Sequence, residues 1–115
     1  LYMNNGHLHY EYNCLSVMRT QLRSAVPVEP GPHRLALQTV LAAPAPGSAA
    51  TFVMRVDGVE VARATAPFTA PLGFTASEAL DVGINLGSPV SLDYYDRAPF
   101  RFNGRIDDVH IVYTP

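Results

Sequence analysis

The sequence predicts an all-β fold, an antiparallel two-layer sandwich of the jelly-roll type, on three observations. Apolar residues make up 48% of the 115-residue chain and charged residues only 16%. Ten prolines and eight glycines divide the apolar stretches into short runs, a pattern typical of brief strands joined by turns. No segment keeps a sustained helical apolar period, although residues 75–80 can form one helical turn. The length suits one domain over residues 1–115, or a fragment of one.

The first predicted hairpin turns at Asn5-Gly6, because this pair readily adopts the positive φ angles of a type I′ turn. Pairing outward from the turn sets Asn4 against His7 and Met3 against Leu8. Side chains alternate along a strand, so the hairpin has one apolar face and one polar face. The apolar face is predicted to hold Leu1, Met3, Leu8, Tyr10 and Tyr12, and the exposed face Tyr2, Asn4, His7, His9 and Glu11.

A second hairpin is predicted at Asp57-Gly58 by the same turn chemistry. Its register places Val56 opposite Val59, Met54 opposite Val61, and Arg55 opposite Glu60 as an exposed ion pair. The apolar side chains of the hairpin then share one face: Phe52, Met54, Val56, Val59 and Val61.

The other strands are predicted from composition and alternation. Residues 18–28 are β-like, Pro30-Gly31-Pro32 makes a turn, and residues 42–50 form a loop of small side chains. In the strand over residues 33–41, the side chains predicted to face inward are Leu35, Leu37, Thr39 and Leu41.

The C-terminal third is predicted to contain two further strands. A short one covers residues 80–84 and is followed by a polar stretch over residues 87–97. The last strand is predicted from Phe100 to Tyr113. Its apolar residues are at even-numbered positions up to Ile106 and at odd-numbered positions from Val109. A β-bulge at Asp107-Asp108 would return both sets to one face.

Several short motifs stand in a fixed order along the chain. They are Tyr10-Glu11-Tyr12-Asn13, Pro30-Gly31 with His33, Val56-Asp57-Gly58, Asp81-Val82-Gly83, Pro89-Val90-Ser91 with Tyr94, and Phe100, Phe102, Gly104 and Ile106. Each motif alone is common, but the ordered set resembles the C-terminal region of bacterial arylsulfatases and spans nearly the whole chain. The sequence departs from that family at Asn85, where Asp is usual, and at His7 and His9, where Lys or Thr is usual.

The resemblance implies a concanavalin-like or laminin-G-like sandwich that follows the catalytic domain of a sulfuric ester hydrolase. It implies no catalytic residue and no cofactor in residues 1–115, whereas the catalytic domain of the parent would use a divalent metal such as calcium. It also implies that the domain is incomplete at its N-terminal side, because the family's sandwich begins some strands before Leu1. Such a truncated sheet would leave an exposed edge and favour a homodimer.

Composition bounds the partners and the compartment. The chain has no lysine, its eight arginines are dispersed, and its net charge is −2, which argues against nucleic acid as a partner. No apolar run has the length needed to span a membrane as a helix. Cys14 is the single cysteine, so it forms no internal disulfide, and the localisation stays undetermined.

Two candidate chemical sites lie in the first part of the chain. Cys14 lacks the Cys/Ser-x-Pro-x-Arg context from which sulfatases generate formylglycine, since the sequence reads Cys14-Leu15-Ser16-Val17-Met18-Arg19, so a structural role at a strand end is expected. His7, His9 and Glu11 alternate on one strand face, where a His-x-His pair can chelate zinc if a third ligand converges. His33 and His110 are isolated in the sequence, and the alternative is an ordinary polar strand face.

The candidate cation ligands of the C-terminal third are Asp81, Asn85, Asp93 and Asp96. Calcium takes oxygen ligands from such side chains, but the spacing matches no EF-hand, and turn-forming roles are the alternative. Tyr94, Tyr95 and Tyr113 can stack on sugar rings or serve packing.

These observations lead to one expected function and two alternatives. We expect a non-catalytic accessory domain that packs against its own catalytic domain. The aromatic residues expected at that inter-domain surface are Tyr2, Phe68, Phe74 and Tyr95. The alternatives are a lectin-like carbohydrate-binding module and a self-association module, and fold alone does not decide among the three.

Overall fold

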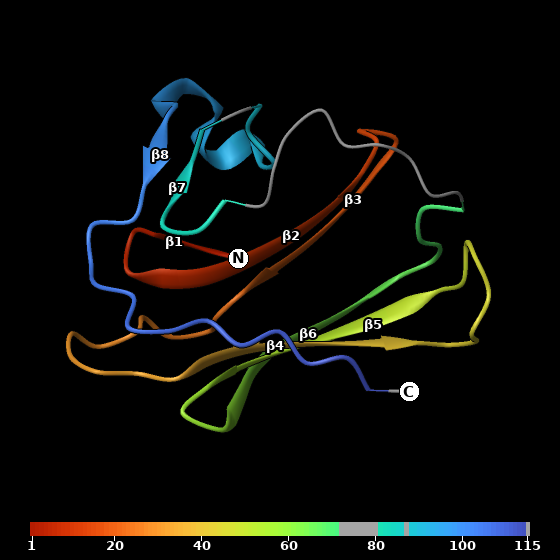
Figure 1. Ribbon diagram of the computed structural model, residues 1–115, viewed down its shortest axis with the longest axis horizontal. Helices are drawn as coiled ribbons and strands as arrows, with labels where there is room; N and C mark the ends of the chain where they lie inside the picture. The colour runs from red at the N-terminus through yellow and green to blue at the C-terminus, as the bar shows by residue number, and fades with distance from the viewer. Residues whose placement is uncertain (72–80, 87, 115) are drawn as a thin grey trace. The chain divides into compact units, whose positions relative to one another are not determined.

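The computed structural model describes residues 1–71, 81–86 and 88–114, and the chain forms two compact units, Leu1–Ser77 and Glu78–Pro115 (Figure 1). All strand pairings within the described residues are antiparallel, which confirms the predicted all-β class. The helical turn expected at residues 75–80 lies outside the described residues. Within the described part of the chain, no helix is long and apolar enough to span a membrane.

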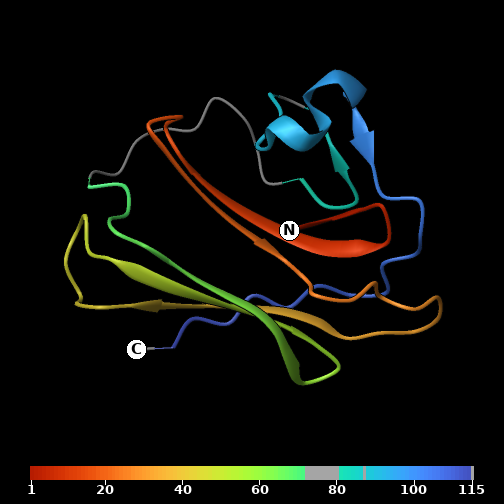
Figure 2. The same cartoon turned by 180° about the vertical axis from the view of Figure 1, so that it is seen from behind.

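Two three-stranded sheets make up the first unit, and Figure 2 shows them from behind. The strands of the first sheet are β1 (Tyr2–Asn4), β2 (His7–Cys14) and β3 (Met18–Arg23), in that order across the sheet. The strands of the second sheet are β4 (Leu35–Leu41), β5 (Ala50–Val56) and β6 (Val59–Ala66), again in chain order.

The Asn5-Gly6 hairpin is confirmed in turn and register. Asn5 and Gly6 have φ angles of 51° and 77°, and Met3 pairs with Leu8. The apolar face is also confirmed except for its first residue, because Leu1 is exposed. The prediction of an exposed polar face is wrong, because Tyr2, Asn4, His7 and His9 are half-buried. The side chain of Glu11 is buried and forms an ion pair with Arg19 of β3.

The Asp57-Gly58 hairpin is confirmed at its turn, with φ angles of 51° and 82°, and Val56 pairs with Val59 as predicted. The predicted pairing of Met54 with Val61 is wrong, because a register shift between Met54 and Arg55 places Ala62 opposite Met54. The shift inserts an extra residue into β6, which changes the parity of the residues beyond it.

Two further expectations for this hairpin are corrected. Val59 is exposed rather than in the core, since it lies directly beside the turn. Arg55 and Glu60 are opposite each other in register, but Glu60 forms its ion pair with Arg63 at 2.6 Å, and Arg55 donates to Gln38 Oε1.

Strands β3 and β4 differ from their predicted forms, and proline and edge position explain the differences. The strand predicted over residues 18–28 ends at Arg23, before Pro27, which lacks the amide hydrogen that a ladder needs. In β4 only Leu37 packs against the core, whereas Leu35, Thr39 and Leu41 are exposed. Because β4 is an edge strand, its side chains have neighbours on one side only.

One hydrophobic cluster joins the two sheets of the first unit. Its buried members are Leu8, Leu22, Ala50, Phe52, Met54 and Ala66. The ring of Phe52 lies 5.1 Å from that of Tyr10 and 5.5 Å from that of Tyr12, so side chains of both sheets interdigitate. Burial raises the pKa of Tyr10 to about 12. The hydroxyl of Tyr12 accepts a hydrogen bond from the amide of Ala70 at 2.9 Å, which ties the segment after β6 to β2.

The second unit is small and is centred on an aromatic pair. β7 (Ile84–Asn85) pairs with β8 (Phe100–Arg101), and the 3-10 helix η1 (Leu92–Arg97) lies between them in sequence. Tyr94 is buried and stacks on Phe100, with ring centroids 4.2 Å apart and an interplanar angle of 7°. The guanidinium of Arg97 lies over the Phe100 ring, 5.2 Å from its centroid.

The predicted strand from Phe100 to Tyr113 is wrong beyond Arg101. Residues 102–114 contain no strand, and the side chains predicted to be buried after the bulge are exposed. Alternation alone makes a strand only where a partner supplies hydrogen bonds, and the described residues supply none to this segment beyond Phe102. Of the short strand predicted over residues 80–84, only Ile84 is in a strand, and residue 80 lies outside the described residues.

Replacing Gly58 by Val should lower the free energy of unfolding by about 1 to 3 kcal/mol, because a β-branched residue is strained at positive φ. No atom lies near the position of the new Cβ, so the loss reports backbone strain rather than a clash. Chemical denaturation measures it. Glu60→Ala, which removes an exposed ion pair beside the same turn, should cost under about 1 kcal/mol. A larger loss for Glu60→Ala would contradict this account of the turn.

Candidate functional site

The polar face of β2 forms an ion pair rather than a metal centre. Glu11 Oε1 accepts a hydrogen bond from Arg19 Nη1 at 3.0 Å, and the Glu11 side chain is only 1% exposed. Its Oε2 atom has no hydrogen-bond partner among the described residues. His9 stacks on Tyr2 at 5.0 Å, and His7 turns toward Ser24. The guanidinium of Arg19 therefore supplies the positive charge beside Glu11, and the predicted His7, His9 and Glu11 ligands do not converge.

His7 and Ser24 form a contact that the sequence did not reveal. His7 Nδ1 lies 2.9 Å from the carbonyl oxygen of Ser24 and 3.5 Å from its hydroxyl. That hydroxyl donates to the carbonyl of Val26 at 2.8 Å and accepts from the amide of Leu8 at 3.1 Å. Because the hydroxyl proton is already donated and Ser24 is only 1% exposed, the pair anchors the chain after β3 and does not form an activated nucleophile.

His33 joins the loop before β4 to the β5–β6 turn. Its Nδ1 lies 2.6 Å from Asp57 Oδ2, and its Nε2 lies 2.6 Å from the carbonyl oxygen of Glu29. The other Asp57 oxygen accepts the amide of Arg34 at 2.8 Å. The Asp57 carboxylate and then the Glu29 carbonyl raise the pKa of His33, because both ring nitrogens face acceptors. The Arg34 amide and the His33 ring lower the pKa of Asp57.

The candidate cation ligands of the second unit serve local structure. Asp81 Oδ2 accepts the amide of Leu86 at 3.0 Å, and Asn85 donates its side-chain amide to the hydroxyl of Tyr94 at 2.9 Å. Asp93 and Asp96 are exposed on η1. The described residues contain no group of His, Cys, Asp and Glu side chains that could hold a metal ion.

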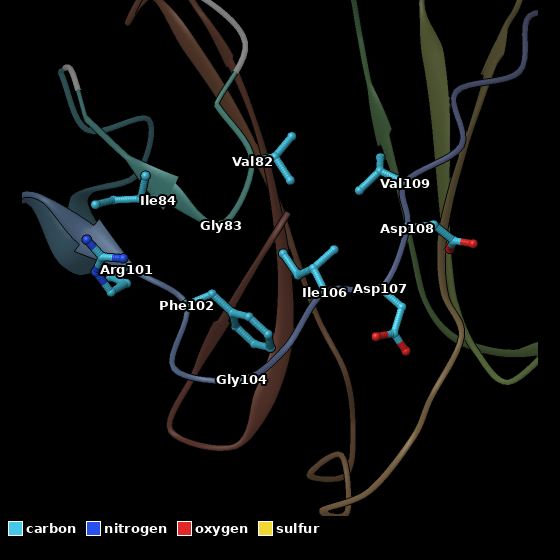
Figure 3. Close-up of a pocket in the computed structure, with 10 residues that line it drawn as sticks. All are labelled: Val82, Gly83, Ile84, Arg101, Phe102, Gly104, Ile106, Asp107, Asp108 and Val109. Carbon is cyan, nitrogen blue, oxygen red and sulfur yellow. The ribbon is translucent and has the colours of Figure 1, made fainter.

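A shallow hollow of about 490 Å³ lies within the second unit (Figure 3). Its lining includes the apolar side chains of Val82, Phe102 and Ile106, which Figure 3 labels. Gly104 is required here because a Cβ at this position would come within 2.6 Å of the Phe102 ring. Asp107 and Asp108 also line the hollow, and they form exposed ion pairs with Arg105 and His110.

Some of the remaining candidate residues are buried in packing contacts, and the others are exposed on the surface. Cys14 ends β2 and is buried, and Tyr94 is buried in its stack on Phe100. Tyr95 and Tyr113 are exposed. Of the aromatic residues expected at an inter-domain surface, Phe68 and Tyr95 are exposed, Tyr2 is half-buried, and Phe74 lies outside the described residues.

Comparisons with family models, curated proteins and solved structures found no match to this chain. The likeness to arylsulfatases therefore depends on the ordered sequence motifs alone.

Calcium at millimolar concentration should leave the melting temperature unchanged, because the side chains of Asp81 and Asn85 are already engaged in hydrogen bonds. Thermal unfolding with calcium and with chelator measures this. A rise with calcium that Asp93→Ala removes would contradict the prediction and indicate a cation site near η1.

The His33–Asp57 contact should make stability depend on pH. The stabilisation by His33 is fully present below the ordinary histidine pKa of 6.5 and is lost as pH rises through the raised pKa of the folded state. The stabilisation by Asp57 is present above the ordinary value of 3.8 and is lost as pH falls through the lowered pKa. His33→Gln should therefore be most destabilising between these two ordinary values, as measured by denaturant unfolding against pH.

Asp57→Asn provides the matched background for this measurement. Asn tolerates the positive φ at this turn position, so the hairpin is kept while the carboxylate is lost. In that background His33→Gln should change the pH dependence of unfolding less, because only Glu29 then still raises the pKa of His33. An unchanged pH dependence in the His33→Gln single variant would show that the contact contributes nothing in solution.

Proposed function

We propose that this chain is a non-catalytic accessory domain, and that it packs against the catalytic domain of an arylsulfatase-like sulfuric ester hydrolase. The ordered motifs described under Sequence analysis support the identity of that partner. The finer fold belongs to the same proposal: a jelly-roll sandwich of the concanavalin or laminin-G type. The shared core of the two sheets in the first unit supports the two-layer arrangement.

One observation carries the association part of the proposal: the exposed apolar side chains of residues 105–114. Ile111 and Val112 are each 79% exposed and Tyr113 is 93% exposed, and Ile106 and Val109 precede them. No backbone hydrogen bond connects residues 105–114 to any described residue. An extended segment with both unpaired backbone groups and large apolar side chains can satisfy both by adding to a sheet or groove of a partner.

A second candidate function is carbohydrate binding, and the hollow in the second unit is the observation that favours it. In its lining, the Phe102 ring provides an apolar surface, and Arg101, Asp107 and Asp108 provide charged hydrogen-bonding groups. An aromatic face flanked by donors and acceptors suits a sugar ring. Saturable binding of a glycan, lost in Phe102→Ala, would support this candidate over packing.

The accessory function is tested with a bacterial arylsulfatase from which the C-terminal region has been removed. The purified chain should bind this catalytic domain and raise its melting temperature. Ile111→Asp should weaken binding at least tenfold, because it places a charge among apolar contacts. His110→Asp introduces the same charge at the neighbouring position, which has the opposite parity, and should have a much smaller effect.

The chain by itself should not hydrolyse a chromogenic aryl sulfate, and Cys14→Ser should behave identically. Turnover above buffer would contradict the non-catalytic assignment. Absence of binding to the truncated sulfatase, together with intact folding, would contradict the proposed partner.

A further inference from the structure

The free edge of β4 has an arrangement of backbone groups that can be derived from its pairing with β5. Asp57 donates its amide to the carbonyl of Arg34, and Ala42 donates to the carbonyl of Ala49, so these residues are at hydrogen-bonded positions of the antiparallel ladder. Hydrogen-bonded positions alternate along such a ladder. The even-numbered residues of β4 therefore bond to β5, and the odd-numbered residues direct their N–H and C=O groups away from it.

The outward-facing residues of β4 are Leu35, Leu37, Thr39 and Leu41, and no hydrogen bond joins them to any other described residue on that side. The side chains on this strand are also open, since Val40 is 48% and Leu41 is 50% exposed. The edge thus presents both a complete set of backbone donors and acceptors and uncovered apolar surface.

The two edges of this sheet differ in protection. β6, at the opposite edge, carries the Glu60–Arg63 ion pair and a bulge, features that discourage the addition of another strand. β4 reads Leu-Ala-Leu-Gln-Thr-Val-Leu over its 7 residues, with no charge, proline or glycine. The sheet therefore has one protected edge and one receptive edge among its described strands.

We propose that β4 pairs with β4 of a second copy of this chain, antiparallel across a two-fold axis, to form a continuous sheet. The axis passes by Gln38, the central residue of the strand. In this register Leu35 is opposite Leu41 of the second copy, Leu37 opposite Thr39, and Ala36 opposite Val40. The odd-numbered residues then form hydrogen-bonded pairs, so every outward-facing backbone group of β4 has a partner.

The sequence of β4 is suited to pairing with itself. Because residues directly opposite each other point to the same side, the exposed Leu35 and Leu41 cover each other at both ends of the interface. Val40 is covered by Ala36 on the other side of the sheet. No like charges meet, since the strand has none, and Arg34 falls outside the paired residues. Any register shifted from this one leaves outward-facing groups unpaired.

A second copy of β4 is a better occupant of this edge than the C-terminal segment of another copy. Residues 105–110 carry the ion pairs Arg105–Asp107 and Asp108–His110, which would be set beside the uncharged apolar strand. The apolar residues of that segment also change parity at Asp107-Asp108, so they cannot all continue one face of the sheet.

Cysteine cross-linking tests the register directly. Residue 38 is at a non-hydrogen-bonded position of the proposed interface, where Cα atoms of opposite residues lie about 4.5 Å apart, within the range for a disulfide. In a Cys14→Ser background, Gln38→Cys should form a disulfide-linked dimer under mild oxidation. Val40→Cys is the matched control, because the two introduced cysteines would be roughly 13 Å apart along the paired strands.

The oligomeric state completes the test. The unmodified chain should sediment as a dimer at micromolar concentration, and Thr39→Pro should make it monomeric with unchanged far-ultraviolet circular dichroism. Proline at this outward-facing position removes no bond to β5 but blocks addition of a strand.

Three results would overturn the proposal. A monomer at high micromolar concentration would show that the edge does not pair. Equal cross-linking of Val40→Cys and Gln38→Cys would contradict the register. A dimer that is lost when residues 105–115 are deleted would assign the edge to the C-terminal segment. None of these results depends on binding to a sulfatase catalytic domain, so the accessory function can fail or hold separately.

Discussion

The packing of Phe52 between Tyr10 and Tyr12 is the contact on which the first unit depends. Phe52 lies in the central strand of one sheet, and the two tyrosines lie in the central strand of the other, so the contact joins the two sheets at their middle. Leu8 and Met54 extend the same layer, and both are completely buried. Central strands satisfy their backbone groups on both sides, which lets their side chains enter a dry core without leaving donors or acceptors unpaired.

The outer strands of the two sheets cover the core around this central contact only in part. Each sheet extends only one strand beyond its central strand on either side, so the outer strands cover the core incompletely. In β4 this leaves Leu37 as the single residue that packs against the core, while its apolar neighbours are exposed. The exposed side chains of β4 therefore result from the narrowness of the sheet and not from a polar sequence.

Local turn chemistry made the hairpins predictable, and long-range contacts made other features unpredictable. Asn5-Gly6 and Asp57-Gly58 specify their turns through the positive φ angles of adjacent residues, so the sequence alone was sufficient. The bulge opposite Met54 and Arg55 was missed because Val61 and Ala62 are both apolar, and alternation does not show which of them faces the core. The burial of Glu11 was missed because its partner Arg19 is on another strand.

The candidate sites show the same limit. The His7–Ser24 contact spans 17 residues and the His33–Asp57 contact spans 24, and neither has a spacing that identifies it in the sequence. Closeness in sequence also gave no convergence of the candidate cation ligands. Asn85 lies in β7, Asp93 and Asp96 lie in η1, and Asp81 accepts the amide of Leu86. The order of the short sequence motifs carries no information about which side chains meet.

The edge of β4 and the C-terminal segment differ in their charge. In water, an unpaired backbone group is solvated at little cost, so an exposed strand edge is tolerated until another strand competes with solvent. Residues 105–110 combine apolar side chains with charged ones, a composition that suits a partner surface with polar groups of its own. β4 has no charge to place against such a surface, and its apolar residues are arranged almost symmetrically about Gln38. A strand with these properties is matched best by a copy of itself, whereas the C-terminal segment is matched best by a different protein surface. The two proposed associations therefore use different segments of the chain, a like partner at β4 and an unlike partner at the C-terminal segment.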